Sequence, residues 1–365
     1  MKKILIISSQ YGGGHRSAAE AIGRGFATWQ PDCVVEHLDF GEIIGESIDK
    51  LFTKSYEFSI RYTPLMHRVL AALMDSDKIL RGANKLVSPI CKSKLRKHFA
   101  KIQPDIVVNT FPAANHTIEK LKKEYGFKFV TVVTDLLSVH HYWISPQTDR
   151  YLVAIPEMIP RLLSLGVAEE KIKITGFVVR PDFLLEKDPL KLKTKLGLDP
   201  KKFTVTYLLG SLPDEFALEM IQKINQLKDT QLIVICGKHE KYEKKIARLK
   251  LANIKIVGFT KRMDEYLRVC DVAIGKAGPG FIMEAATIGK PVILTSYIAP
   301  QEQGNVELVL TKKWGFFAPG VDLVLEKIEK IQKMNPAEYT EICRLAKETN
   351  PGNSARNIVD FIAKY

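Results

Sequence analysis

A glycine-rich segment with one histidine, residues 9–17, directly follows the first apolar stretch of the chain. Its three consecutive glycines allow the backbone to approach a ligand closely. The helix predicted over 18–29 would supply free N–H groups and a partial positive charge at its N-terminus. The segment is therefore predicted to hold a polar or anionic group. It does not match a dinucleotide site, because Arg16 and Ser17 stand where the last glycine is expected, and it lacks the G-K-[ST] of a P-loop.

His15 lies in this segment and is the best candidate for a general base in the chain. An unperturbed imidazole titrates at pH ~6.5, which suits proton transfer near neutral pH. The alternative is a histidine that only caps or orients the loop.

A second glycine-rich turn, residues 278–280, follows an apolar strand predicted to end at Ile274. The helix predicted over 281–288 begins there and repeats the anion-binding geometry of a helix N-terminus. Glu284 lies about one turn into this helix, where its carboxylate can accept hydrogen bonds from a ribose diol. The alternative is a glutamate that the helix macrodipole favours near the helix start.

Amide and carboxylate side chains cluster at Gln301, Glu302 and Asn305, after the strand predicted over 291–294. Donors and acceptors on short loops suit the recognition of sugar hydroxyls, although such side chains usually face water. A smaller turn of the phosphate-binding type, Gly210-Ser211, follows the strand predicted over 204–209. Because these loops contain no D-x-D motif that would hold a metal-bound diphosphate, we expect helix N-termini and backbone N–H groups to neutralise a diphosphate without a metal.

Apolar runs of strand length alternate with helical patterns along the whole chain. Runs that are β-branched and apolar on both faces are typical of parallel sheets covered by helices on both sides. The predicted fold class is α/β, with two doubly wound Rossmann-like domains that face a cleft. The runs are 4–8, 34–38, 106–109, 129–134, 151–154, 172–175, 204–209, 230–236, 254–257, 272–274 and 291–294.

A domain boundary is predicted at about residues 176–181, where a strand ends and a Lys-rich stretch follows. The first domain would cover residues 1–178 and the second residues 179–351. Apolar residues at helical spacing predict a last helix within 352–365 that packs back on the first domain. These residues are Ala355, Ile358, Val359 and Ile362.

The composition is that of a soluble globular protein, with 365 residues of which 46% are hydrophobic and 26% charged. No apolar run approaches the roughly 20 residues of a membrane-spanning helix, and the run 4–7 is too short for a secretory signal. The five cysteines form no C-x-x-C pair. This spacing favours a reducing cytoplasm over a disulfide framework or a zinc site.

The net charge of +13 is unevenly distributed, because residues 50–101 hold 12 Lys and Arg against three acidic residues. Apolar and aromatic residues recur in this segment at spacings of three and four, which is typical of amphipathic helices. Such a helix suits an anionic membrane surface. A solvated helix face packed on its own domain explains the pattern equally well. Nucleic acid is a third option, which no recognised motif supports.

Several motifs together resemble one family. They are G-G-G-H-R at 12–16, T-D-L at 134–136 followed by His140 and Trp143, T-G at 175–176 followed by V-R-P at 179–181, G-F at 258–259, G-K-A-G-P-G at 275–280 followed by E-A at 284–285, and Q-E with G-N within 301–305. With these motifs the chain resembles the monogalactosyldiacylglycerol synthases and the bacterial diacylglycerol glucosyltransferases. Both are relatives of the peptidoglycan N-acetylglucosaminyltransferase and have the two-domain GT-B fold.

The resemblance implies an inverting transfer of glucose or galactose from a UDP-sugar to a lipid, with no cofactor and no metal. The expected lipid acceptor is diacylglycerol. It implies that His15 deprotonates or orients the acceptor hydroxyl. It also implies an enzyme attached peripherally to the cytoplasmic face of the cell membrane, which it meets through residues 50–101. The implied nucleotide site is Gly210, Ser211, Gly258, Phe259, Gly278, Gly280, Phe281 and Glu284, the sugar site is Gln301, Glu302 and Asn305, and the acceptor loop is Gly12, Gly13, Gly14, Tyr142 and Trp143.

Two other functions remain open from the sequence. UDP-sugar 2-epimerases share the fold and have no lipid acceptor, so the fold alone does not fix the function. The basic amphipathic segment favours the transferase over the epimerase. A non-catalytic UDP-sugar sensor is disfavoured because His15 is present.

Overall fold

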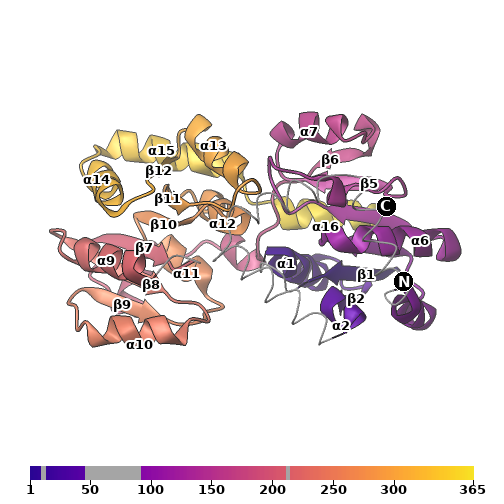
Figure 1. Ribbon diagram of the computed structural model, residues 1–365, viewed down its shortest axis with the longest axis horizontal. Coiled ribbons are helices and arrows are strands. Elements are labelled where there is room, and N and C mark those ends of the chain that lie inside the picture. Colours follow the sequence, from indigo (N-terminus) through magenta and orange to yellow (C-terminus); the bar gives the residue numbers. More distant parts are fainter. Residues whose placement is uncertain (10–13, 46–91, 211–213) are drawn as a thin grey trace. The chain divides into compact units, whose positions relative to one another are not determined.

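The computed structural model describes residues 1–9, 14–45, 92–210 and 214–365. Two compact units, each built on a six-stranded parallel sheet, confirm the predicted α/β class (Figure 1). The first unit contains Met1–Pro181, Ala299–Gln301 and Asn353–Tyr365, and the second contains Asp182–Ile298 and Glu302–Gly352. Gly12, Gly13, Ser211 and residues 50–91 of the basic segment lie outside the described residues.

The sheet of the first unit has the strand order β2-β1-β3-β4-β5-β6. Alternate residues of β1 face opposite sides: Ile4 and Ile6 pack under α1 and α16, whereas Leu5 and Ile7 pack against the other helical layer. Each face therefore has its own hydrophobic core. The strands are β1 (Lys3–Ser8), β2 (Val34–Asp39), β3 (Ile106–Asn109), β4 (Lys128–Val132), β5 (Arg150–Val153) and β6 (Ile172–Ile174).

Helices cover both faces of this sheet (Figure 1). The α-helices are α1 (Gly14–Trp29), α2 (Phe40–Ile44), a helix over 92–102, α6 (Asn115–Tyr125), α7 (Ile159–Ser164) and α16 (Ser354–Lys364). The short 3-10 helices are η1 (Pro112–Ala114), η2 (His141–Trp143), η3 (Pro156–Met158), η4 (Glu169–Lys171) and, at the junction of the units, η5 (Pro181–Leu184). Across the described parts of the chain, no helix combines the length and the apolar character needed to cross a membrane.

The last helix, α16, packs on α1 of the first unit. Ile358 and Val359 are fully buried there, and Gly25 of α1 leaves room for Val359, since a Cβ on Gly25 would lie 2.9 Å from it. The Ser354 hydroxyl donates to the carbonyl of Phe177. The C-terminal residues are thus part of the core that carries β1.

Replacing Ile358 with Ala should lower the unfolding free energy of the first unit by about 2–5 kcal/mol, because it empties a fully buried site. Urea unfolding followed by hydrogen exchange of the β1 and α1 amides would measure the loss. Exchange of the second unit's sheet should not change. Equal destabilisation of both units would contradict this assignment of α16.

The sheet of the second unit has the order β12-β11-β10-β7-β8-β9. Its strands are β7 (Phe203–Leu208), β8 (Thr230–Ile235), β9 (Ile254–Val257), β10 (Val272–Lys276), β11 (Val292–Ser296) and β12 (Gly315–Phe317). Its helices are α8 (Pro189–Lys195), α9 (Asp214–Asn225), α10 (Glu240–Arg248), α11 (Met263–Arg268), α12 (Pro279–Thr287), α13 (Gln303–Thr311), α14 (Val321–Gln332) and α15 (Pro336–Thr349). The central strands β7 and β10 are buried on both faces, as in other doubly wound sheets.

Two sequence-based predictions of elements were wrong. Helix α1 begins at Gly14 rather than at residue 18, so His15, Arg16 and Ser17 belong to its first turn and not to a loop. Apolar periodicity begins only at Ala18, because the residues of the first turn are not buried in the core. The edge strand β12 was not predicted, because three residues are too few to give an alternating pattern.

Candidate active site

His15 lies where three strands of the first unit end. Its ring nitrogen Nδ1 is 2.7 Å from the hydroxyl of Thr134, which follows β4. The hydroxyl of Thr110, which follows β3, donates to the backbone carbonyl of His15 at 3.0 Å. The first turn of α1 is therefore fixed to the carboxyl ends of neighbouring strands, where ligands of such sheets bind.

Aromatic rings hold the imidazole from two sides. The ring of Phe111 meets it edge to face with centroids 5.3 Å apart, and the ring of Trp143 lies at 5.8 Å. Trp143 is fully buried, and its indole N–H donates to Asp135 at 2.8 Å. His140 approaches the same carboxylate oxygen at 3.4 Å. Trp143 therefore orients His15 and Asp135 from within the core, whereas Tyr142 beside it is half-buried.

Two buried amide side chains, hydrogen-bonded to each other, fix the backbone around Trp143. Asn115 at the start of α6 donates through Nδ2 to the carbonyls of Tyr142 and Trp143, at 3.0 and 2.9 Å. Asn109 at the end of β3 donates to Asn115 Oδ1 at 2.7 Å. Burying an amide side chain without hydrogen bonds costs free energy, so the hydrogen bonds of Asn109 and Asn115 fix the position of η2.

Burial lowers the pKa of His15, and the negative charge of Asp135 opposes this effect. A hydrogen bond between the ring and the backbone of Thr110 also tends to raise the pKa of His15. Burial also tends to raise the pKa of Asp135, but hydrogen bonding and charge from His140, the charge of His15 and the Trp143 N–H together hold it below its ordinary value. His15 is therefore neutral at neutral pH, with Nδ1 engaged by Thr134. In the tautomer whose Nδ1–H donates to Thr134, Nε2 is the nitrogen that can accept a proton.

If His15 is the base, activity should fall on the acidic side with an apparent pKa below the 6.5 of an unperturbed histidine. Asp135→Asn removes a negative charge that stabilises the imidazolium, so the acidic limb of the pH profile, where activity falls, should move to still lower pH. The pH dependence of kcat/KM for both proteins measures the shift. A limb that moves to higher pH would contradict the electrostatic role of Asp135.

In the second unit, a glycine turn and a lysine come together after β7 and β10. A Cβ on Gly210 would lie 3.5 Å from Cβ of Lys276. A Cβ on Gly278, the N-cap of α12, would lie 3.8 Å from the Lys276 ammonium nitrogen. Gly278 provides no side chain to cap the helix. The N–H groups at the start of a nine-residue helix and an ammonium group therefore meet at one place, which favours an anion. Oε1 of Glu302 lies at the same place, 3.7 Å from the Cβ position of Gly278.

Glu302 holds this ammonium. Its Oε1 forms an ion pair with Lys276, and its Oε2 accepts the backbone N–H of Ile298 at 2.7 Å. The residue is 7% exposed. Each carboxylate oxygen thus has a partner in the second unit, and Glu302 positions Lys276. Gln301 directly precedes it and is half-buried.

Asn305 of α13 ties the same region together. It is 1% exposed, and its Nδ2 donates to the carbonyl of Ala277 at 2.8 Å. Its Oδ1 is buried and has no partner in the described part of the chain. Asn305 therefore fixes the turn before α12 and does not project from the surface.

The other predicted nucleotide residues lie on α12 and after β9. Phe281 packs on β10, because a Cβ on Gly275 would lie 3.2 Å from its ring. Glu284 is half-buried on α12. The Phe259 side chain is 66% exposed, and a Cβ on Gly258 would lie 2.9 Å from the Glu243 carboxylate. Glu243 is thus a further polar group at this turn, which the sequence analysis missed.

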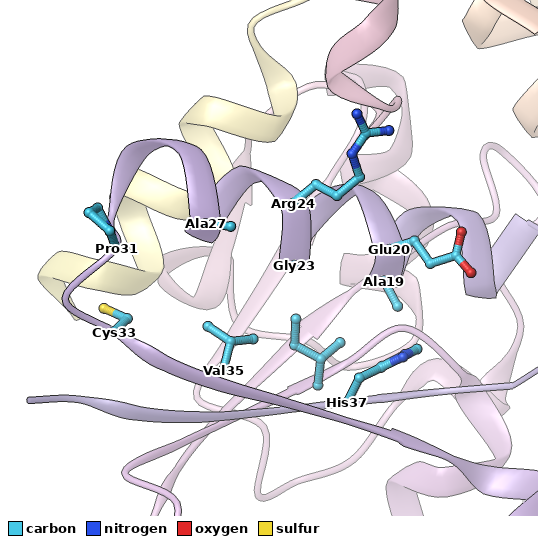
Figure 2. Close-up of a pocket in the computed structure, with 10 residues that line it drawn as sticks. Ala19, Glu20, Gly23, Arg24, Ala27, Pro31, Cys33, Val35 and His37 are labelled. Carbon is cyan, nitrogen blue, oxygen red and sulfur yellow. The ribbon is translucent and has the colours of Figure 1, made fainter. Parts of the chain in front are cut away.

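A cavity of about 640 Å³ lies elsewhere in the first unit, between α1 and the edge strand β2. Figure 2 shows Gly23 and Ala27 of α1 facing Val35 and His37 of β2 across it. None of the predicted site residues lines this cavity. No group of three His, Cys, Asp or Glu side chains in the described ranges is placed to hold a metal ion.

Solved structures similar to this chain have the GT-B fold. HepE from Anabaena in complex with UDP and glucose superposes with a TM-score of 0.61 at 15% identity, over 100% of this chain and 99% of that chain. A UDP-N-acetylglucosamine 2-epimerase superposes with a TM-score of 0.60 at 14% identity, over 99% and 95%. At such low identity the likeness concerns the fold alone.

Family models match the two halves of the chain separately. The model described as monogalactosyldiacylglycerol (MGDG) synthase matches residues 15–179, which include His15, Asp135 and Trp143. The glycosyltransferase family 28 C-terminal domain matches residues 209–347, which include Lys276 and Glu302.

Curated relatives cover both halves at once. The chain is 30% identical to monogalactosyldiacylglycerol synthase 1 of Arabidopsis thaliana over 344 residues, which cover 87% of this chain and 62% of that synthase. It is 30% identical to synthase 3 of the same plant over 340 residues, which cover 87% of this chain and 71% of the relative. The chain therefore belongs to the monogalactosyldiacylglycerol synthase family.

Proposed function

We propose that the chain is a hexosyltransferase that moves glucose or galactose from a UDP-sugar to the free hydroxyl of diacylglycerol, with inversion at the anomeric carbon. The observation that carries this proposal is His15, a neutral imidazole that Thr110 and Thr134 fix at the strand ends, in the half that matches the MGDG synthase model. HepE, which shares the fold, is a structure with UDP and glucose bound, which supports a UDP-sugar donor.

In the proposed reaction, Nε2 of His15 takes the proton of the acceptor hydroxyl as its oxygen bonds to the anomeric carbon. The bond between that carbon and the phosphate oxygen of UDP breaks, and UDP leaves with the electron pair. One direct displacement inverts the configuration. The proposal requires the tautomer in which Nδ1–H donates to the Thr134 hydroxyl and Nε2 carries no proton, and Asp135 stabilises the imidazolium that forms.

The second unit would stabilise the leaving group. Charge develops on the diphosphate as the bond breaks, and the Lys276 ammonium and the N-terminus of α12 supply fixed positive charge at one place. We assign uracil to the turn at Gly258 and Phe259, the ribose to Glu284 and the sugar to the region of Gln301. Glu302 and Asn305 act on the donor indirectly, because they hold Lys276 and the turn before α12.

The acceptor is a lipid in this proposal, so the enzyme works at a membrane surface. We propose peripheral attachment at the cytoplasmic face through the basic, aromatic segment 50–101. The competing function is a UDP-sugar 2-epimerase, since a structure of one shares the fold. The match of the first half to the MGDG synthase model favours the transferase.

Incubation with radiolabelled UDP-glucose or UDP-galactose and diacylglycerol in mixed micelles tests the proposal. Label in the lipid phase is expected, and the better donor identifies the sugar. Conversion of the label into another UDP-sugar in the aqueous phase would replace the proposal with the epimerase. If neither occurs, the proposed donor and acceptor are wrong.

A further inference from the structure

A second basic segment, residues 238–262, lies in the second unit. It holds nine Lys and Arg residues against two Glu residues. Together with residues 50–101 it accounts for the entire positive net charge, since the rest of the chain is slightly acidic. Positive charge that is concentrated in two segments is typical of a surface that binds an anionic partner. Solubility alone does not require the charges to be clustered.

Helix α10 arranges this charge on one face. Lys241, Lys244, Lys245 and Arg248 recur at the spacing i, i+3, i+4 and i+7, which places them along one stripe of a helix. All four are exposed. On the other side, Ile246 is 1% exposed and packs into the core under the sheet. The basic face of α10, defined by these four residues, therefore points to solvent.

Three of the four cations of this face, Lys241, Lys244 and Arg248, are not neutralised by the described carboxylates. Glu243 turns toward Gly258, where a Cβ would lie 2.9 Å from its carboxylate. Among the residues that the structure describes, no carboxylate forms an ion pair with Lys241, Lys244 or Arg248. Their charge is thus available to an anionic partner.

We propose that the basic face of α10 binds an anionic lipid surface, as a contact in the second unit in addition to residues 50–101. The choice of lipid rests on the proposed function, whose acceptor is a lipid. Lysine ammonium groups in a short exposed stripe suit the diffuse negative potential of a bilayer. Single-stranded nucleic acid is disfavoured, because the stripe contains no aromatic side chain on which bases could stack.

The experiment compares the full chain with the quadruple variant Lys241→Gln, Lys244→Gln, Lys245→Gln and Arg248→Gln. Sedimentation with phosphatidylcholine vesicles, alone or with about one third phosphatidylglycerol, measures binding at low and high salt. Each Lys or Arg near such a surface raises the binding constant about fivefold. The variant should therefore bind the anionic vesicles at least about tenfold more weakly.

A matched control removes four other exposed lysines of the second unit. These are Lys191, Lys201, Lys228 and Lys333, each replaced by Gln. The control should bind within about twofold of the unchanged protein, since its charges do not form one stripe. If both variants lose binding equally, only net charge matters and the proposal is overturned.

Two further outcomes separate this proposal from others. If the α10 variant binds anionic vesicles as well as the unchanged protein but loses binding to an oligonucleotide, the surface serves nucleic acid and the proposal is wrong. Transfer to diacylglycerol in neutral detergent micelles should be the same in the α10 variant and the unchanged protein. Absence of transfer in both would refute the proposed function while leaving the vesicle result valid.

Discussion

His15→Ala should lower kcat for hexose transfer by about 10²–10⁴-fold, the usual contribution of a general base. The dissociation constant for UDP should stay unchanged, because His15 lies in the first unit and the anion site at Lys276 in the second. Steady-state kinetics measures the first effect and calorimetric titration with UDP the second.

A matched control for this prediction is His116→Ala, which removes a half-buried histidine of α6 in the same unit. It should leave kcat within about twofold, since surface changes away from a site have small effects. Retention of activity in His15→Ala would remove His15 as the base. A loss of UDP affinity parallel to the loss of kcat would mean that His15 supports nucleotide binding instead.

Lys276→Met should weaken UDP binding by about 10–100-fold, since a hydrogen bond to a charged group contributes about 1.5–3 kcal/mol. Uridine, which lacks the diphosphate, should bind with unchanged affinity. The same variant should lower kcat, because the charge that stabilises the departing UDP is gone. Titration with UDP and with uridine separates diphosphate recognition from a general disturbance of the site.

Removing Lys276 alone leaves the buried Glu302 carboxylate unpaired, which by itself destabilises a protein. The double variant Lys276→Met with Glu302→Gln avoids this and should show the same loss of UDP affinity. The control variant Lys290→Met removes a charge from the same unit. Lys290 precedes β11, at the end of the sheet opposite to Lys276, so this variant should bind UDP normally. If the double variant also binds UDP normally, Lys276 does not contact the diphosphate.

Local patterns in the sequence predicted the strands well. Apolar, β-branched runs located eleven of the twelve strands in the described part of the chain, including the partly exposed edge strands β2, β6 and β9. The start of α1 was missed because its first turn, at Gly14 and His15, is occupied by residues that serve the site and not the core. Local helix propensity is weak where glycine stands.

Contacts between residues far apart in the sequence were missed. Thr134 and Asp135 were named only as part of the T-D-L motif, and nothing local predicts that Thr134 meets His15, 119 residues away. The pairing of Lys276 with Glu302 likewise joins the end of β10 to the N-cap of α13. The stripe on α10 could have been found from the i, i+3, i+4, i+7 spacing of its basic residues, because charge was related to helical spacing only for residues 50–101.

The linkage in the lipid product tests the central claim most directly. UDP-glucose and UDP-galactose carry an α-linked sugar, so one displacement assisted by His15 gives a β-linked hexosyl diacylglycerol. Proton NMR of the purified lipid product reads the anomeric configuration from its coupling constant. We predict a β linkage. An α-linked product would contradict direct displacement, and the absence of any glycosylated lipid would contradict the assignment as a diacylglycerol hexosyltransferase.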